Sequence, residues 1–171
     1  MLVMKLKSSG FSLIELMVVV AILAIVASVA MPSFRGMLMN SQVRNATESV
    51  LNGLQKARAE AVKRNVNVEF VLGADTGWVV KLAGGAQLES RSSSEGSVNV
   101  TRTTLPGAAT TVTFTNLGGI AVANADASAV LTQVNTAATG ADRSLRVMVG
   151  AGGNVRMCDP NLAAGSSPRA C

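Results

Sequence analysis

A single carboxylate, Glu15, interrupts residues 10–34, which otherwise have the composition of a membrane-spanning segment. Between Glu15 and Arg35 lie 19 consecutive residues without a charged side chain. A charge buried in lipid near a helix centre costs roughly 2.5 to 3.5 kcal/mol on insertion scales, so a carboxylate here predicts a function. In apolar surroundings an ionised carboxylate is a strong partner for a cation at short range.

The two cysteines, Cys158 and Cys171, lie close together near the C-terminus. In an exported chain they predict a disulfide that closes the tail into a loop, whereas in a reducing compartment both would be free thiols. A loop of that size contributes about 3 kcal/mol of stability in the chain-entropy model. A two-cysteine metal site is not expected, because no other good ligands cluster nearby.

Four C-terminal arginines could contact DNA phosphates, a mode of binding that is independent of sequence and sensitive to salt. They are Arg143, Arg146, Arg156 and Arg169. The net charge of +5 suits an anionic partner such as nucleic acid or a lipid surface, without requiring one. The tail contains no aromatic side chain that could stack on bases. The alternative is that these arginines form solvated or subunit-facing ion pairs.

The sequence offers no catalytic constellation. It contains no histidine, which excludes His-dependent triads and His metal sites. The glycine-rich segment "GAGG" at 150–153 lacks the spacing, the lysine and the following helix of a phosphate-binding loop, so it predicts a turn between two strands. We therefore expect neither enzymatic activity nor a cofactor nor a metal.

The element that carries Glu15 is long enough to cross a bilayer, because 19 helical residues extend about 28 Å. A cleaved secretory signal would have a shorter apolar region and a clear A-x-A site, which "ASVAMPSF" matches only loosely. A plain single-pass anchor leaves Glu15 unexplained. Pro32 removes a backbone donor and predicts a kink or a locally melted turn where the span ends.

Beyond the span, the hydrophobic period predicts an amphipathic helix and then strands. Apolar residues recur at helical spacing from Val43 to Ala61, so residues 35–65 should pack one face on a soluble domain. After Asn65 the period changes to two. The expected strands are "NVEFVL" (67–72), "GWVVKL" (77–82), "SVNVTR" (97–102), "TTVTFTN" (110–116) and "SLRVMVG" (144–150). Residues 123–142 are weakly patterned and predict a strand around 129–134 within a mobile loop.

The segment "KLKSSGFSLIELMVVVAILAIVASVAMP" resembles the class III signal of type IV pilins and type II secretion pseudopilins. The resemblance rests on a short basic leader, the Gly10–Phe11 junction, Glu15 at the fifth position after it and the uncharged span. It implies that a prepilin peptidase cuts between Gly10 and Phe11 and methylates Phe11. The new α-amino group would pair with Glu15 of a neighbouring subunit, which fixes the register between packed helices.

The rest of the chain resembles the FimT/GspH (FimU-like) branch of minor pilins, through "LQKARAEAVKRN", a "GW" strand and "G-x-V-R-x-CDP" before a closing cysteine. This implies an α+β fold, with a long N-terminal hydrophobic α-helix packed into a C-terminal antiparallel β-sheet domain that has two sheets. The expected parts are a leader (1–10), a transmembrane and polymerisation helix (11–34), an amphipathic half-helix (35–65) and a β-rich periplasmic domain with a disulfide loop (66–171).

The resemblance implies a structural subunit of the bacterial inner membrane that crosses it once and joins a type IV pilus or a type II secretion pseudopilus. Its expected partners are the prepilin peptidase/methyltransferase, other major and minor pilins or pseudopilins, and the inner-membrane assembly platform. The alternative is a DNA-binding minor pilin for DNA uptake. Some relatives bind DNA through G-R-x-R at this tail, where the present chain has Gly153, Asn154, Val155 and Arg156 and so lacks the first arginine.

Overall fold

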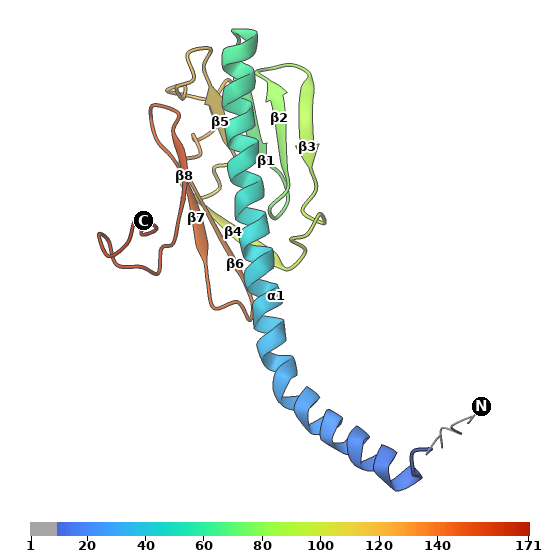
Figure 1. Ribbon diagram of the computed structural model, residues 1–171. Coiled ribbons are helices and arrows are strands. Elements are labelled where there is room, and N and C mark those ends of the chain that lie inside the picture. The colour runs from blue at the N-terminus through green and yellow to red at the C-terminus, as the bar shows by residue number, and fades with distance from the viewer. Residues whose placement is uncertain (1–9) are drawn as a thin grey trace, which may run out of the picture. The chain divides into compact units, whose positions relative to one another are not determined.

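The computed structural model describes residues 10–171, so the predicted leader lies outside the described residues except for Gly10. A long helix, α1 (Leu13–Arg64), is followed by eight strands in two antiparallel sheets (Figure 1). The chain divides into two compact units, Met1–Arg35 and Gly36–Cys171, and α1 contributes residues to both.

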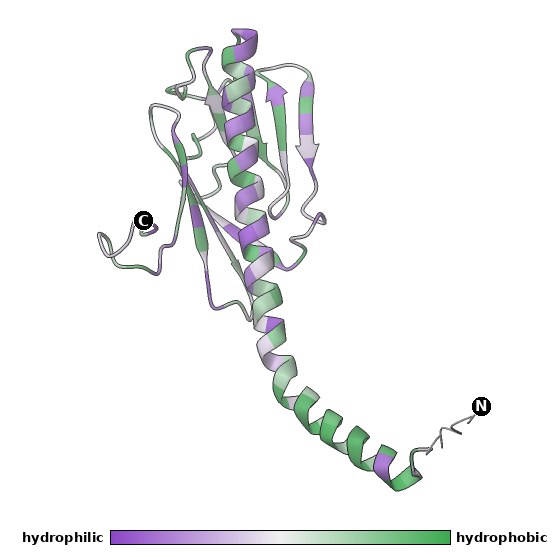
Figure 2. Cartoon of the chain, in the orientation of Figure 1, coloured by the Kyte–Doolittle hydropathy of each residue, from purple (hydrophilic) through white to green (hydrophobic). Residues whose placement is uncertain are grey.

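The first unit is the apolar part of α1, and it begins where Ser12 accepts the first helical hydrogen bond from the Leu16 N–H. All its described residues are exposed, and Figure 2 shows this part of the helix as mostly hydrophobic, with hydrophilic colour near the helix start. The helix is unbroken at Pro32, so the locally melted turn that we considered for this proline is absent. By length and composition, α1 can cross a membrane.

The second unit contains the amphipathic part of α1, and the predicted apolar stripe forms its buried face. The stripe consists of Val43, Ala46, Val50, Leu54, Ala57 and Ala61, all at most 1% exposed. The opposite face carries ion pairs at i,i+4, including Arg64 with Glu60. The hydrogen bond from the Arg64 guanidinium holds the pKa of Glu60 below its usual value. The helical period alone therefore identified which face packs on the domain.

The strands form two four-stranded sheets with every neighbouring pair antiparallel, as the resemblance implied. Sheet A has the order β3-β2-β1-β5 and contains β1 (Val68–Leu72), β2 (Trp78–Leu82), β3 (Gln87–Arg91) and β5 (Thr111–Phe114). Sheet B has the order β4-β6-β7-β8 and contains β4 (Val100–Leu105), β6 (Gln133–Ala138), β7 (Leu145–Val149) and β8 (Val155–Cys158).

The core of the domain lies between α1 and the inner faces of both sheets. Leu54 of α1 belongs to the same buried cluster as Phe70 of sheet A and Val147 of sheet B. The helix lies directly against sheet A at Gly53, where a Cβ would lie 2.7 Å from a ring carbon of Phe70 and 2.9 Å from the indole of Trp78. The Trp78 Nε1–H also donates to the Ser49 hydroxyl over 2.8 Å, which fixes the indole against α1.

Two strand predictions were wrong in detail, one strand was missed, and β8 was expected only as the strand after the "GAGG" turn, without bounds. The strand expected around 129–134 is β6, which begins only at Gln133, because the residues before it form a loop in which Leu131 is fully buried. The strand expected at 97–102 begins at Val100. We did not predict β3 (Gln87–Arg91), because this edge strand is polar and forms by pairing with β2 rather than by burying an apolar face.

The loop of residues 121–130 is fixed by a buried asparagine, Asn124, which is 4% exposed. Its amide nitrogen donates to the backbone oxygens of Thr111 (3.1 Å) and Ser128 (3.2 Å), and its Oδ1 accepts from the Thr113 hydroxyl (3.0 Å). The side chain of Asn124 thus ties the loop to the edge strand β5. A segment that we expected to be mobile is anchored here through polar contacts that no hydrophobic pattern reveals.

Replacing Asn124 with alanine is expected to destabilise the domain by about 1 to 3 kcal/mol, because buried donors and acceptors lose their partners. Urea denaturation of the chain in detergent measures this change. Asn99→Ala is the matched control: Asn99 is exposed and makes one long hydrogen bond, 3.3 Å to Gln42, so its loss should change stability by less than about 0.5 kcal/mol. Equal effects of the two variants would contradict the anchoring role.

Candidate functional site

The start of α1 brings together the residues that the sequence singles out for processing and assembly. Gly10, Phe11 and Glu15 are all exposed, and the Phe11 side chain retains 84% of its accessible surface. Ser12 caps the helix, because its hydroxyl accepts a hydrogen bond from the Glu15 N–H over 3.3 Å. The predicted cleavage junction and the carboxylate are therefore separated by about one helical turn.

Ser12 is a residue that our sequence reasoning missed, although the pattern Ser-x-x-Glu that could have revealed it is present at 12–15. This spacing is typical of a capping box, which places a carboxylate in the first helical turn. The partial positive charge of a helix N-terminus favours a carboxylate there by about 0.3 to 1 kcal/mol. That gain is smaller than the roughly 2.5 to 3.5 kcal/mol cost of a carboxylate near the centre of a lipid-embedded helix, so capping alone does not account for Glu15.

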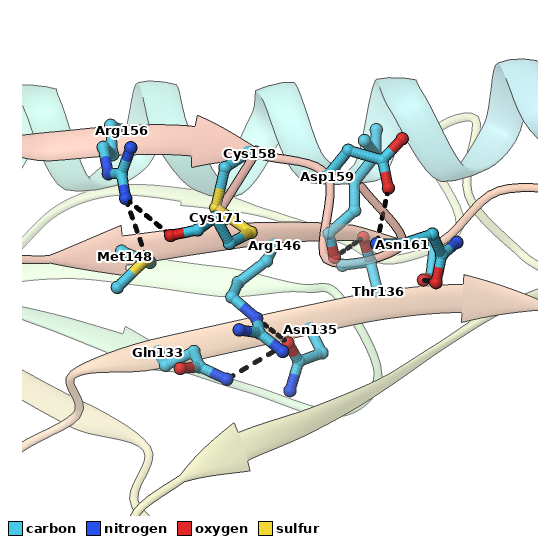
Figure 3. Close-up of a disulfide and its surroundings, with 12 residues drawn as sticks. Gln133, Asn135, Thr136, Arg146, Met148, Arg156, Cys158, Asp159, Asn161 and Cys171 are labelled. Carbon is cyan, nitrogen blue, oxygen red and sulfur yellow. Dashed lines mark hydrogen bonds between the residues drawn. A yellow bond between two sulfur atoms is a disulfide. The ribbon is translucent and has the colours of Figure 1, made fainter. Parts of the chain in front are cut away.

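The predicted disulfide between Cys158 and Cys171 is confirmed, and the alternative of two free thiols is wrong. The two Cα atoms lie 5.1 Å apart, and Cys158 is 3% exposed. Within the loop, the Asp159 N–H donates to the Arg169 oxygen over 2.7 Å (Figure 3 shows the disulfide and its surroundings). The tail of residues 159–171 contains no strand and little buried apolar surface, so the disulfide is its main constraint.

Replacing both cysteines with serine is expected to lower stability by about 3 kcal/mol, in line with the chain-entropy model for a loop of this size. Denaturation curves of the wild type and the Cys158→Ser/Cys171→Ser variant measure the difference. Adding a reductant to the wild type should reproduce it, whereas the same reductant should leave the variant unchanged. A loss well below about 1 kcal/mol in both experiments would show that the tail is held without the disulfide.

The structure separates the four predicted anion-binding arginines into two pairs. Arg143 and Arg169 line a groove of about 660 Å³ that also includes Met37 and Arg44 of α1 and Met157 of β8. Arg146 and Arg156 lie instead on neighbouring strands of sheet B. By the alternation of side chains, they project from the face opposite to the buried Val147 and Val149. Within residues 10–171, none of the four arginines forms a salt bridge.

Family models match both parts of the chain. Residues 46–153 match the family described as type II transport protein GspH, and residues 5–31 match the prokaryotic N-terminal methylation motif. Both matches agree with the resemblance read from the sequence.

Among solved structures, the chain is similar to two crystal structures of the type IV minor pilin FimU from Pseudomonas aeruginosa. Each is 21% identical to this chain and covers 72% of it, with TM-scores of 0.54 and 0.55. The matches include 98% and 93% of the respective FimU chains. At this identity the likeness concerns the fold, and it confirms the predicted α+β, pilin-like architecture. The DNA-binding alternative receives no support from any of these matches.

Proposed function

The chain belongs to the GspH family of type II transport proteins, and on this premise we propose that it is a minor pilin or pseudopilin. It is a structural subunit that takes part in assembling a type IV pilus or a type II secretion pseudopilus. It crosses the bacterial inner membrane once through α1 and places the domain of residues 36–171 in the periplasm. It carries out no catalysis and needs no cofactor.

The observation that carries this proposal is the apolar part of α1, which is exposed along its entire described length and bears one acid, Glu15. An exposed helix of this kind must be covered by lipid or by other helices, because its apolar surface is too large to leave in water. Aliphatic side chains such as Val18, Ile22 and Ile25 pack equally well in both environments. The same segment therefore serves first as a membrane anchor and then as the polymerising element.

Glu15 sets the register of that polymer. Cleavage after Gly10 leaves an α-amino group on Phe11, and this amine of one subunit pairs with Glu15 of the next at low dielectric. The pairing favours a stagger of about one helical turn between adjacent helices. Pro32 allows the helix to bend between the polymerising segment and the domain. The domain makes lateral contacts with other minor subunits.

Mass spectrometry of the native protein from membranes and from sheared filaments tests this function. The expected mass is that of residues 11–171 with one additional methyl group and one disulfide, in both fractions. Gly10→Val should block cleavage and leave the uncut chain in the membrane, while Gly36→Ala, a glycine change far from the junction, should be processed normally. Native material that retains residues 1–10, or that has lost the apolar helix, would overturn the proposal.

A further inference from the structure

The two sheets carry very different charge patterns. The strands of sheet A contain two acids and two bases, and all four are paired: Lys81 with Glu69, Glu89 with Lys56 of α1, and Arg91 with Glu95. The strands of sheet B contain no acid and three arginines, Arg102, Arg146 and Arg156. None of these three forms a salt bridge with an Asp or Glu side chain within residues 10–171. The arginines of sheet B are therefore not compensated by acidic side chains, whereas the charges of sheet A are paired.

Two of these arginines lie on the outer face of sheet B, which we define as the face opposite to the buried Val134 and Val147. Arg102 lies on the other face and donates to the Gly73 oxygen over 2.8 Å, so it is engaged within the domain. On the outer face, Thr103 and Ala137 are exposed, and Met148 is partly exposed. This accessible sheet surface combines small and apolar side chains with Arg146 and Arg156, and it contains no acid.

The guanidinium of Arg146 is held in place by a ladder of polar side chains across three strands. The Arg146 Nε donates to Asn135 Oδ1 over 2.7 Å, and the Asn135 amide nitrogen donates to the Thr103 hydroxyl over 3.3 Å (Figure 3 shows the first contact). Gln133 donates to the same Asn135 oxygen over 3.2 Å. The two terminal amino groups of Arg146 have no hydrogen-bond acceptor within residues 10–171. They are held in place through Nε and can donate two parallel hydrogen bonds to one carboxylate.

Arg156 is oriented by the disulfide-closed tail. One terminal amino group donates to the Cys171 oxygen over 3.2 Å and contacts the sulfur of Met148 (Figure 3). Arg146 lies opposite Cys158 in the ladder and Arg156 opposite Met148, so the two arginines are diagonal neighbours. Diagonal positions on adjacent strands are about 7 to 8 Å apart, which lets two guanidinium groups bind two separate carboxylates.

From this arrangement we infer that the outer face of sheet B docks a neighbouring pilin-class subunit through a surface that carries at least two carboxylates. The inference rests on the proposed function, because it names a contact of the assembled subunit. Sheet B has arginines without acidic side-chain partners, whereas the charged side chains of sheet A pair within the domain. This difference favours an acidic protein partner on sheet B. Arg146 binds one carboxylate through its fork, and Arg156 binds a second. The apolar and small side chains beside them on the outer face supply a dry contact surface.

Site-specific photo-crosslinking in cells that assemble filaments tests this contact with the full chain. A photoreactive amino acid at Ala137, on the outer face, should crosslink to another subunit, within a peptide that contains Asp or Glu. Arg146→Gln combined with Arg156→Gln should reduce the yield about tenfold or more, because each charge-assisted hydrogen bond to an ionised partner is worth about that factor. The matched control, Arg143→Gln with Arg169→Gln, removes the same charge from the groove and should leave the yield unchanged.

A second photoreactive position, Leu23 in the apolar part of α1, separates failure of this contact from failure of the proposed function. If Leu23 crosslinks to other subunits and Ala137 does not, the docking surface is wrong while the assembly role stands. If neither position crosslinks, both are wrong. If nuclease treatment removes the adduct at Ala137, the partner is nucleic acid and not protein, which would overturn the inference. A partner peptide without acids, or a yield that both double variants lower equally, would also overturn the inference.

Discussion

Glu15→Gln is expected to abolish incorporation of the chain into filaments while leaving it cleaved, methylated and membrane-bound. Glutamine keeps the size of the side chain and removes the charge, so the α-amino group of the neighbouring subunit loses its partner at low dielectric. Removing one partner of a buried ion pair typically costs about 3 to 5 kcal/mol, which corresponds to more than a hundredfold in an equilibrium constant. The insertion of the helix into lipid should become easier, because a charge has been removed.

The measurement is the ratio of this protein in sheared filaments to that in membranes, determined by quantitative immunoblotting. Ser12→Ala is the matched control, since it removes the helix cap and keeps the carboxylate. The loss of such a cap costs about 1 kcal/mol and leaves the ion pair available, so incorporation should fall only slightly. Normal incorporation of the Glu15→Gln variant would refute the register role, whatever the effect at Ser12.

Gly53→Val is expected to destabilise the domain of residues 36–171 by about 3 kcal/mol or more, because it overpacks a site without free space. At this position a Cβ already falls 2.7 Å from a Phe70 ring carbon and 2.9 Å from the Trp78 indole. Both rings belong to the buried core, so neither can move aside without disturbing sheet A. Denaturation followed by Trp78 fluorescence measures the loss and reports on the same contact.

Gly36→Ala is the control for Gly53, because it makes a glycine change in the same helix where space exists. A Cβ at Gly36 would meet nothing closer than 3.8 Å. Alanine is preferred over glycine in helices by about 1 kcal/mol, so this variant should be as stable as the wild type or more so. A Gly53 variant with wild-type stability would contradict the close packing of α1 on sheet A.

The sequence predicted the elements whose function or burial imposes a regular pattern. The stripe from Val43 to Ala61 repeats at helical spacing because one face of the helix is buried, and all six of its residues lie in the core. Strand β1 places Val68, Phe70 and Leu72 in the core for the corresponding reason. The junction at Gly10 and the acid at Glu15 stood out because their spacing resembles a processing signal, and we propose that it serves recognition rather than folding.

The remaining features depend on partners that are distant in sequence. Strand β3 is held by backbone pairing with β2, which leaves no hydrophobic signature in "QLESR". Asn124 is buried because Thr111 and Thr113 offer matching hydrogen bonds from another strand. The four C-terminal arginines looked like one group along the chain, yet the groove takes two and the outer face of sheet B takes the others. Only the strand order decides such placements.

The order of the strands also determines how this subunit bears mechanical load. The chain passes from sheet A to sheet B after β3, returns for β5 and leaves again for β6, so neither sheet can be peeled away without pulling on the other. The buried face of α1 contacts both sheets from Val43 to Ala61. Tension along the helix axis loads all these contacts in shear at the same time, so the contacts do not break one after another. The domain should therefore yield in a single rupture when a filament is stretched.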